Sequence, residues 1–296
     1  MPLEPVSQMM RRAREGGYAV GYFESWDLAS LQGVIDAAEQ SRSPVIVGFS
    51  GEFLSRPGRL ATERLRLYGA LGQAAAETAQ VPCALIFNEC PHDEWTFEAI
   101  AAGFNLVMPS PGADSPGDYR RRTREVVRQA HAAGVAVEAE LGELPYGGAG
   151  SVDHAHASVT DPADAERFVR ETGVDLLAVS VGNVHILLQG ERGLDLNRLE
   201  QLRRQVPVPL VLHGGSGIDP GSLGEAIRRG VAKVNYGTCL KRPYLAAVRA
   251  AVTAPVDNPH RVLGLGDRED MFLAGRRAVR DAVLERIPHL GCSGRS

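Results

Sequence analysis

The stretch PLVLHGGSGIDPGSLGEAIRRGVAKVNYGT, residues 209–238, contains a complete strand–helix–strand unit. The apolar runs at 209–213 and 232–236 have the length and composition of buried strands. Between them, residues 219–230 show helical periodicity, open with Asp-Pro and close with a glycine, as helices commonly do. Two buried strands joined by a helix are typical of a parallel sheet covered by helices.

The same unit recurs towards the N-terminus. Six further strands are predicted, each followed by a helix-like segment, at 18–23, 44–50, 83–87, 106–108, 135–141 and 176–181. Eight strands that alternate with helices predict an α/β protein with a closed (β/α)8 TIM barrel. A doubly wound open sheet is the alternative, but it usually carries G-x-G-x-x-G after its first strand. This chain has YFESWDLAS (22–30) there.

The rest of the chain fits a single domain. No low-complexity linker divides the 296 residues, so we predict one domain over 1–296 with a helical extension at 267–287. Hydrophobic residues make up 44% of the sequence, enough for a large core.

Charge and cysteine content favour a cytoplasmic enzyme or binding protein. The net charge is −4 with acids and bases mixed, so we expect no nucleic-acid partner. The N-terminal residues lack an apolar signal core, and no stretch reaches membrane-spanning length, so no membrane partner is expected. The four cysteines form no C-x-x-C pair, which favours a reduced, intracellular protein.

Polar side chains follow the predicted strands, at the end of a TIM barrel where active sites lie. They are Glu24, Ser25, Ser50, Asn88, Glu89, Cys90, His92, Ser110, Glu138, Glu140, Asn183, His185, His213 and Asn235. Loops are commonly polar, but these residues are of the types that bind metals or transfer protons. The sequence therefore predicts a site at this end of the barrel.

Two features of this set point to ligands. Glycine-rich segments follow the last two strands, HGGSG (213–217) and NYGT (235–238), where barrels frequently bind phosphate through free backbone N–H groups. Each segment alone is also a common turn. His185 and His213 follow neighbouring strands, and together they make a pair of metal ligands, although a single histidine is more often structural.

Several longer stretches resemble the class II, metal-dependent ketose-bisphosphate aldolases. They are AVSVGNVH (178–185), PLVLHGGSGI (209–218), GVAKVNYGTCLKR (230–242), VEAELG (137–142) and the opening segment 10–50. The resemblance covers nearly the whole chain and implies a TIM barrel that acts as a carbon–carbon lyase in carbohydrate metabolism. It also implies a homodimer or homotetramer.

The resemblance implies a phosphorylated small-molecule substrate and a divalent metal, usually Zn²⁺. Three histidines hold the metal, which polarises the substrate ketone, and two of them match His185 and His213. The phosphate is expected in the loops after the last two strands. The substrate-binding residues predicted in this way, with Ser50 from the second strand, are Gly214, Gly215, Ser216, Asn235, Tyr236, Gly237 and Thr238.

The third strand departs from the family pattern. The family typically has L-H-x-D-H where this chain has LIFNEC (85–90). The third metal-binding histidine aligns with Glu89, which is still able to bind zinc but makes harder ions such as Mn²⁺ more competitive. Cys90 and His92 are rival third ligands.

The aspartate that transfers a proton in the family aligns with Asn88. An amide cannot transfer a proton near neutral pH, and such transfer contributes about 10²–10⁴-fold in rate. Glu140 is predicted to share catalysis with Asn88, and the other candidates for the proton-transfer group are Glu24, His92, Asp153, His154 and His156. The loop at 145–156 is interpreted either as a mobile lid or as an ordinary surface loop.

Three hypotheses follow. The preferred one is a divergent metal-dependent aldolase that acts on a keto-sugar phosphate. The second is a metal-free enzyme in which Glu89 is the acid/base. The third is a protein that binds sugar phosphates without turnover.

Overall fold

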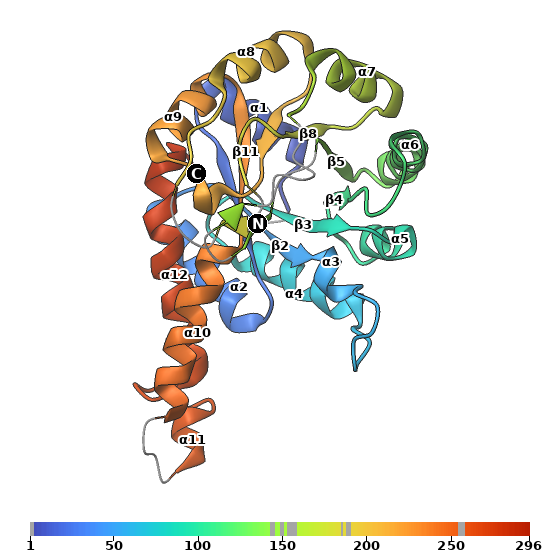
Figure 1. Cartoon of the computed structure of the whole chain (residues 1–296). Helices are drawn as coiled ribbons and strands as arrows, with labels where there is room; N and C mark the ends of the chain where they lie inside the picture. The colour runs from blue at the N-terminus through green and yellow to red at the C-terminus, as the bar shows by residue number, and fades with distance from the viewer. Residues whose placement is uncertain are drawn as a thin grey trace.

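The computed structural model describes residues 3–142, 146–148, 151–152, 159–184, 186–187, 191–253 and 258–296. Eight parallel strands close into a barrel in the order β1-β2-β3-β4-β5-β8-β10-β11, and β11 pairs with β1 (Figure 1). They are β1 (Val20–Glu24), β2 (Val45–Ser50), β3 (Cys83–Cys90), β4 (Leu106–Pro109), β5 (Ala136–Leu141), β8 (Leu176–Val179), β10 (Leu210–Leu212) and β11 (Val231–Tyr236). The predicted TIM barrel is confirmed.

Helices surround this barrel, and the last three extend past it (Figure 1). They are α1 (Val6–Gly16), α2 (Leu28–Ser41), α3 (Gly51–Leu54), α4 (Leu65–Thr78), α5 (Asp93–Ala101), α6 (Pro116–Ala132), α7 (Pro162–Thr172), α8 (Leu196–Gln205), α9 (Pro220–Arg228), α10 (Thr238–Thr253), α11 (Pro259–Val262) and α12 (Met271–Leu290). The Asp-Pro signals mark two helix starts as predicted, because Asp161 caps α7 and Asp219 caps α9 through their side chains.

A small second sheet was not predicted. It consists of β6 (Tyr146–Gly148), β7 (Ser151–Val152) and β9 (Ile186–Leu187), in the order β7-β6-β9. Two or three residues are too few to show the alternation that identifies a strand, and β6 is rich in glycine. The side chains of this region, including Asp153, His154 and His156, lie outside the described residues.

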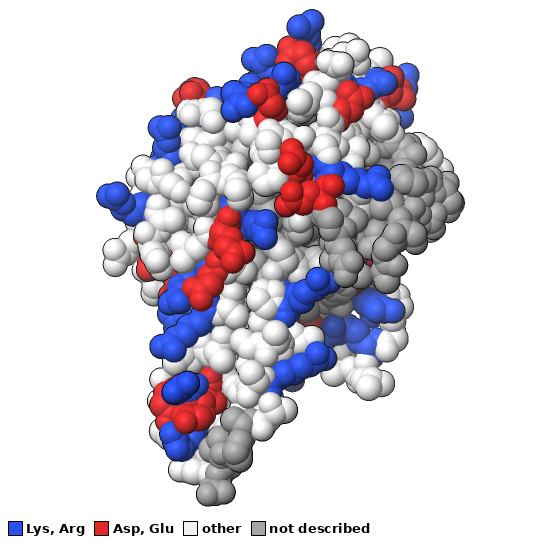
Figure 2. Space-filling view, turned by 60° about the vertical axis from the view of Figure 1, so that its left-hand side comes forward, with Lys and Arg blue, Asp and Glu red and all other residues white. Residues whose placement is uncertain are grey.

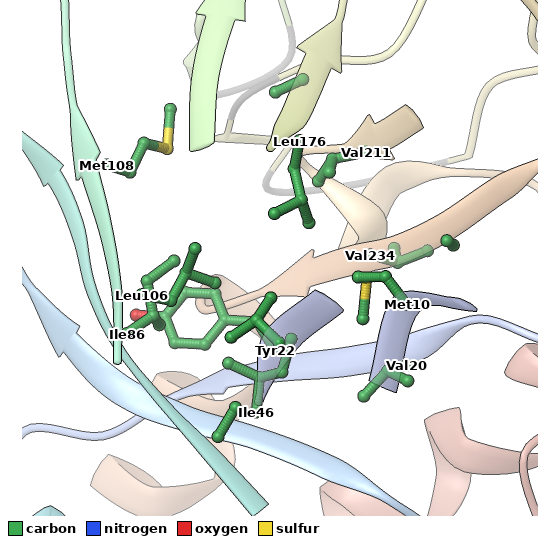
Figure 3. Close-up of a cluster of buried hydrophobic side chains, with 14 of the residues drawn as sticks. Met10, Val20, Tyr22, Ile46, Ile86, Leu106, Met108, Leu176, Val211 and Val234 are labelled. Carbon is green, nitrogen blue, oxygen red and sulfur yellow. The ribbon is translucent and has the colours of Figure 1, made fainter. Parts of the chain in front are cut away.

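The core fills the inside of the barrel and one of its ends. Met10 of α1 is 1% exposed and lies in one buried cluster with Val20, Tyr22 and Val234 (Figure 3). Helix α1 therefore adds apolar side chains to the core that the barrel strands form.

The predicted C-terminal extension is helical. Figure 1 shows α10 and α12 side by side, extending past the barrel, with α11 at their far end. Apolar side chains are exposed on this hairpin at Leu245, Val252, Leu263, Leu265 and Phe272. On the face shown in Figure 2, acidic and basic side chains are interspersed. Within the described ranges, no helix combines the length and the apolar character needed to cross a membrane.

Candidate active site

Strand β5 directs two carboxylates into the barrel. Glu138 and Glu140 alternate with the buried Val137 and Ala139, so the two acids share the inner face. Glu138 is completely buried, and its Oε1 lies 2.9 Å from Nε2 of His213, which follows β10. Because a buried carboxylate and imidazole need partners, this contact fixes the ring of His213.

A buried lysine completes this group. Nζ of Lys233, on β11, lies 2.8 Å from Oε2 of Glu138, and both side chains are fully buried. Burial favours the neutral form of Glu138, but the charge of Lys233 and the hydrogen bond from His213 outweigh it and lower its pKa. Glu138 is therefore an anion held between two donors.

Glu89 reaches the same histidine through an irregular strand. In a regular strand it would face the opposite side from Asn88, but the pairing of β3 with β4 shifts between Phe87 and Cys90. The φ angle of Glu89 is 55°, a left-handed conformation that costs a non-glycine residue about 1–2 kcal/mol. As a result, Oε1 of Glu89 lies 2.9 Å from Nδ1 of His213.

Glu140 is the third carboxylate near this ring. Its Oε1 is 3.8 Å from Nδ1 of His213, and within the described part of the chain this buried oxygen accepts no hydrogen bond. Burial raises the pKa of Glu140 to about 7, with further increases from the charges of Glu89 and Glu138, opposed by His213. Burial alone would lower the pKa of His213, but its hydrogen bonds to Glu138 and Glu89 raise it to about 10.

The two rival metal ligands, at the end of β3 and just after it, lie elsewhere. The thiol of Cys90 is completely buried, 3.2 Å from the carbonyl oxygen of His92 and 3.9 Å from Oγ of Ser55. His92 precedes α5 as its N-terminal flanking residue. Of the residues after Asn88 on this strand, the structure therefore directs Glu89 to His213. His185 lies outside the described residues.

The orientation of the Asn88 amide follows from Lys233. An ammonium group only donates, so Oδ1 of Asn235, 2.5 Å from Nζ of Lys233, is the acceptor. The Nδ2 group of Asn235 then donates to Oδ1 of Asn88 at 3.5 Å. Because Oδ1 of Asn88 is the acceptor in this network, its Nδ2 group is the one that can donate a hydrogen bond to a ligand.

A cavity of about 290 Å³ lies next to this cluster, at the carboxyl ends of the strands. Asn88, Glu89 and His213 line it. Of the predicted phosphate residues, those that line it are Ser50, Gly214, Ser216, Asn235, Gly237 and Thr238. Tyr236 also lines it, but its ring is stacked on Phe23 with the ring centroids 5.2 Å apart. Gly215 packs underneath, since a Cβ there would lie 2.6 Å from Val234.

The two glycine-rich loops meet here. Gly214 has φ 67°, which a glycine adopts without strain, and the backbone N–H of Cys239 donates to Oγ of Ser216 at 3.4 Å. Helix α10 begins at Thr238, which lines the same cavity. The partial positive charge of a helix N-terminus beside a glycine-rich loop attracts an anion.

Sequence reasoning did not single out Lys233 and Lys241. Lys241 lies in the first turns of α10 and lines the cavity, and its Nζ is 2.7 Å from Oε1 of Glu24. A lysine inside the apolar strand AKVNY (232–236) is a signal that could have identified Lys233, because a buried lysine needs an anionic partner.

The donors around His213 fit a divalent cation. No group of three His, Cys, Asp or Glu side chains arranged to hold a metal is found among the described residues, and the predicted ligand His185 is not one of them. However, within the described ranges the buried oxygen of Glu140 beside His213 lacks a hydrogen bond, and Glu138 binds the Nε2 of that histidine. In metal-binding histidines, the ring nitrogen that does not bind the metal typically donates to a carboxylate.

Fold and site together define a TIM-barrel protein with a carboxylate–histidine cluster beside glycine-rich, anion-binding loops. The family model for class-II fructose-bisphosphate aldolase matches residues 4–295. The chain therefore belongs to the class-II fructose-bisphosphate aldolase family.

Two solved structures illustrate this similarity. The YdjI aldolase from Escherichia coli K12 is 31% identical, with a TM-score of 0.82, and the match covers 100% of this chain and 99% of that one. Fructose-bisphosphate aldolase from Campylobacter jejuni is 22% identical with a TM-score of 0.77, and the match covers 98% of this chain and 95% of that one. The second comparison supports the fold alone.

Proposed function

We propose that this protein is a metal-dependent carbon–carbon lyase that cleaves a keto-sugar phosphate and, in reverse, forms it. The observation that carries the proposal is the convergence of Glu89 and Glu140 on His213, beside the two loops that open to an anion. Family membership supports an aldolase-type reaction.

The cation would be held by His213 and Glu89, with His185 as the third ligand. A bound divalent ion supplies Lewis-acid polarisation of the substrate ketone. Zn²⁺ is expected, and the carboxylate of Glu89 makes Mn²⁺ a stronger competitor than it is at a site with three histidines.

The loops position the substrate. The backbone N–H groups after β10 and at the start of α10 bind the phosphate, which places the ketone end of the substrate next to His213. Holding the phosphate at a fixed distance from the reacting carbons lowers the entropic part of the barrier.

Glu140 and Asn88 divide the task that the aligned aspartate performs in the family. As the C3–C4 bond breaks, the C4 hydroxyl proton passes to the carboxylate of Glu140, and the bonding electrons stay on the ketone fragment. The Nδ2 group of Asn88 donates a hydrogen bond to the C4 oxygen while its charge develops. Glu140 then returns its proton to C3, so that protons and electrons balance.

Proton exchange tests this proposal without knowledge of the full substrate. In D₂O, the protein should exchange one carbinol proton of dihydroxyacetone phosphate, as followed by proton NMR. EDTA should stop the exchange and added Zn²⁺ should restore it. Binding of dihydroxyacetone phosphate without exchange would contradict the lyase and favour a sugar-phosphate-binding protein. Exchange that survives EDTA would contradict the metal.

A further inference from the structure

We infer that the cavity accepts a ketose with one phosphate and an uncharged, hydroxylated far end, and that Glu52 disfavours a second phosphate. This inference rests on the proposed function and narrows its substrate class.

The charges around the cavity are the first argument. Its described lining contains three carboxylates, Glu24, Glu52 and Glu89, and one cationic side chain other than histidine, Lys241. The segments that the structure does not describe add no lysine or arginine, because 1–2, 143–145, 149–150, 153–158, 185, 188–190 and 254–257 contain neither residue. The divalent ion of the proposed function would offset the charge of Glu89, and Lys241 is paired with Glu24. A second phosphate dianion would therefore meet the negative charge of Glu52 and no further lysine or arginine in the described lining.

Lys241 lies at the end of the cavity where the phosphate is proposed to bind. It belongs to α10, whose N-terminus forms part of the anion-binding loops, and its Nζ is 2.7 Å from Oε1 of Glu24 and 4.3 Å from the ring centroid of Phe53. The other oxygen of Glu24 packs against Gly237, where a Cβ would lie 2.5 Å away. One lysine with a carboxylate partner at the loop is suited to one phosphate.

Glu52 places a further negative charge at the cavity. It lies in the first turn of α3, directly after Ser50 and Gly51 at the end of β2. Burial raises the pKa of Glu52 and the negative charge of Glu89 raises it further, while the charges of Arg56 and Lys241 oppose the rise. A phosphate bound beside Glu52 would be repelled by its carboxylate.

Carboxylates are good acceptors for hydroxyl groups. Each ionised oxygen accepts hydrogen bonds and donates none, so Glu52 matches the O–H groups of a sugar chain and not the oxygens of a phosphate. The same residue that opposes a second phosphate therefore suits a polyol.

The test uses pairs of ketohexose 1-phosphates and 1,6-bisphosphates of the same configuration, such as fructose 1-phosphate and fructose 1,6-bisphosphate. For the pairs that are cleaved, kcat/KM should favour the monophosphate by about ten-fold or more. Glu52→Gln should narrow this ratio by increasing cleavage of the bisphosphate. Glu98→Gln, the same change at an exposed position of α5, is the matched control and should leave the ratio unchanged.

Calorimetric Kd values for the same pairs separate this inference from the proposed function. Tighter binding of monophosphates without cleavage of any pair would contradict the lyase and support the charge preference. Bisphosphates that bind as tightly as monophosphates, or a preference that Glu52→Gln leaves unchanged, would overturn the inference whatever the turnover.

Discussion

At the scale of single residues, the site depends on side chains whose partners are far away in the chain. Glu138 and His213 are separated by 75 positions, and Asn235 and Asn88 by 147. Only the closure of the barrel brings them together, because β3, β5, β10 and β11 all direct their carboxyl ends to one side.

The orientation of Asn88 leads to a kinetic prediction. If its Nδ2 group stabilises developing charge on the C4 oxygen, Asn88→Ala should lower kcat by about 10²–10³-fold with little change in KM. Steady-state cleavage of the best ketose phosphate measures this. A rise in KM at unchanged kcat would assign Asn88 to binding alone.

The buried ion pair leads to a stability prediction. Lys233→Met removes one of the two partners of the buried Glu138 carboxylate and leaves His213 as the other, and we expect a loss of about 3 kcal/mol in the free energy of unfolding, measured with urea. The double variant Lys233→Met, Glu138→Gln removes the buried charge as well and should recover most of the loss. Equal destabilisation of both variants would show that packing, and not charge, is responsible.

The sequence predicted part of this site. Strand ends identified Glu89, Glu140 and His213, since side chains at the carboxyl ends of barrel strands share one rim. The contact between Glu89 and His213 depends on the left-handed backbone of Glu89, and no sequence pattern marks that irregularity. The orientation of Asn88 depends on Lys233, and the apolar pattern of the surrounding strand gives no indication of that contact.

At the scale of elements, strands and helices follow local signals closely. The strand predicted at 83–87 continues to Cys90, beyond the end of its apolar run, because pairing with β2 extends to Asn88. The strand predicted at 176–181 ends at Val179. Both differences occur at the carboxyl ends of barrel strands, where polar side chains interrupt the apolar pattern that identifies a strand.

Helix α12 provides a prediction about pH. The carboxylate of Asp270 accepts hydrogen bonds from the backbone N–H groups of Gly264, Gly266, Phe272 and Leu273 at 2.8–3.1 Å. Its pKa is lowered, because these bonds outweigh its burial. The anion therefore adds stability above the unfolded-state pKa of about 3.9, and this is lost as the pH falls through the lower folded-state value.

Asp270→Asn should consequently destabilise the fold by about 1–3 kcal/mol at pH 7, because the amide nitrogen would face backbone donors. The difference from the unmodified protein should shrink below about pH 3. Thermal unfolding at both pH values measures it. Asp281→Asn, an exposed site on the same helix with a side chain 60% exposed, is the control. A pH-independent difference would contradict the assignment.

At the scale of the whole molecule, the alternation of strands and helices was sufficient to predict the barrel. Parallel strands with helical crossovers have few ways to bury both faces of a sheet, so eight such units specify the closed form. The homodimer or homotetramer that the family resemblance implies stays a prediction. The apolar side chains exposed on the α10–α12 hairpin are where we expect such contacts.

The central claim is that the rim of this barrel holds a divalent cation through His213 and Glu89. The most direct measurement is the metal content per chain of the purified protein, of His213→Ala and of Glu89→Gln, by plasma mass spectrometry. We predict about one divalent ion per chain in the unmodified protein and far less in both variants. Active protein that contains no stoichiometric metal would contradict the account.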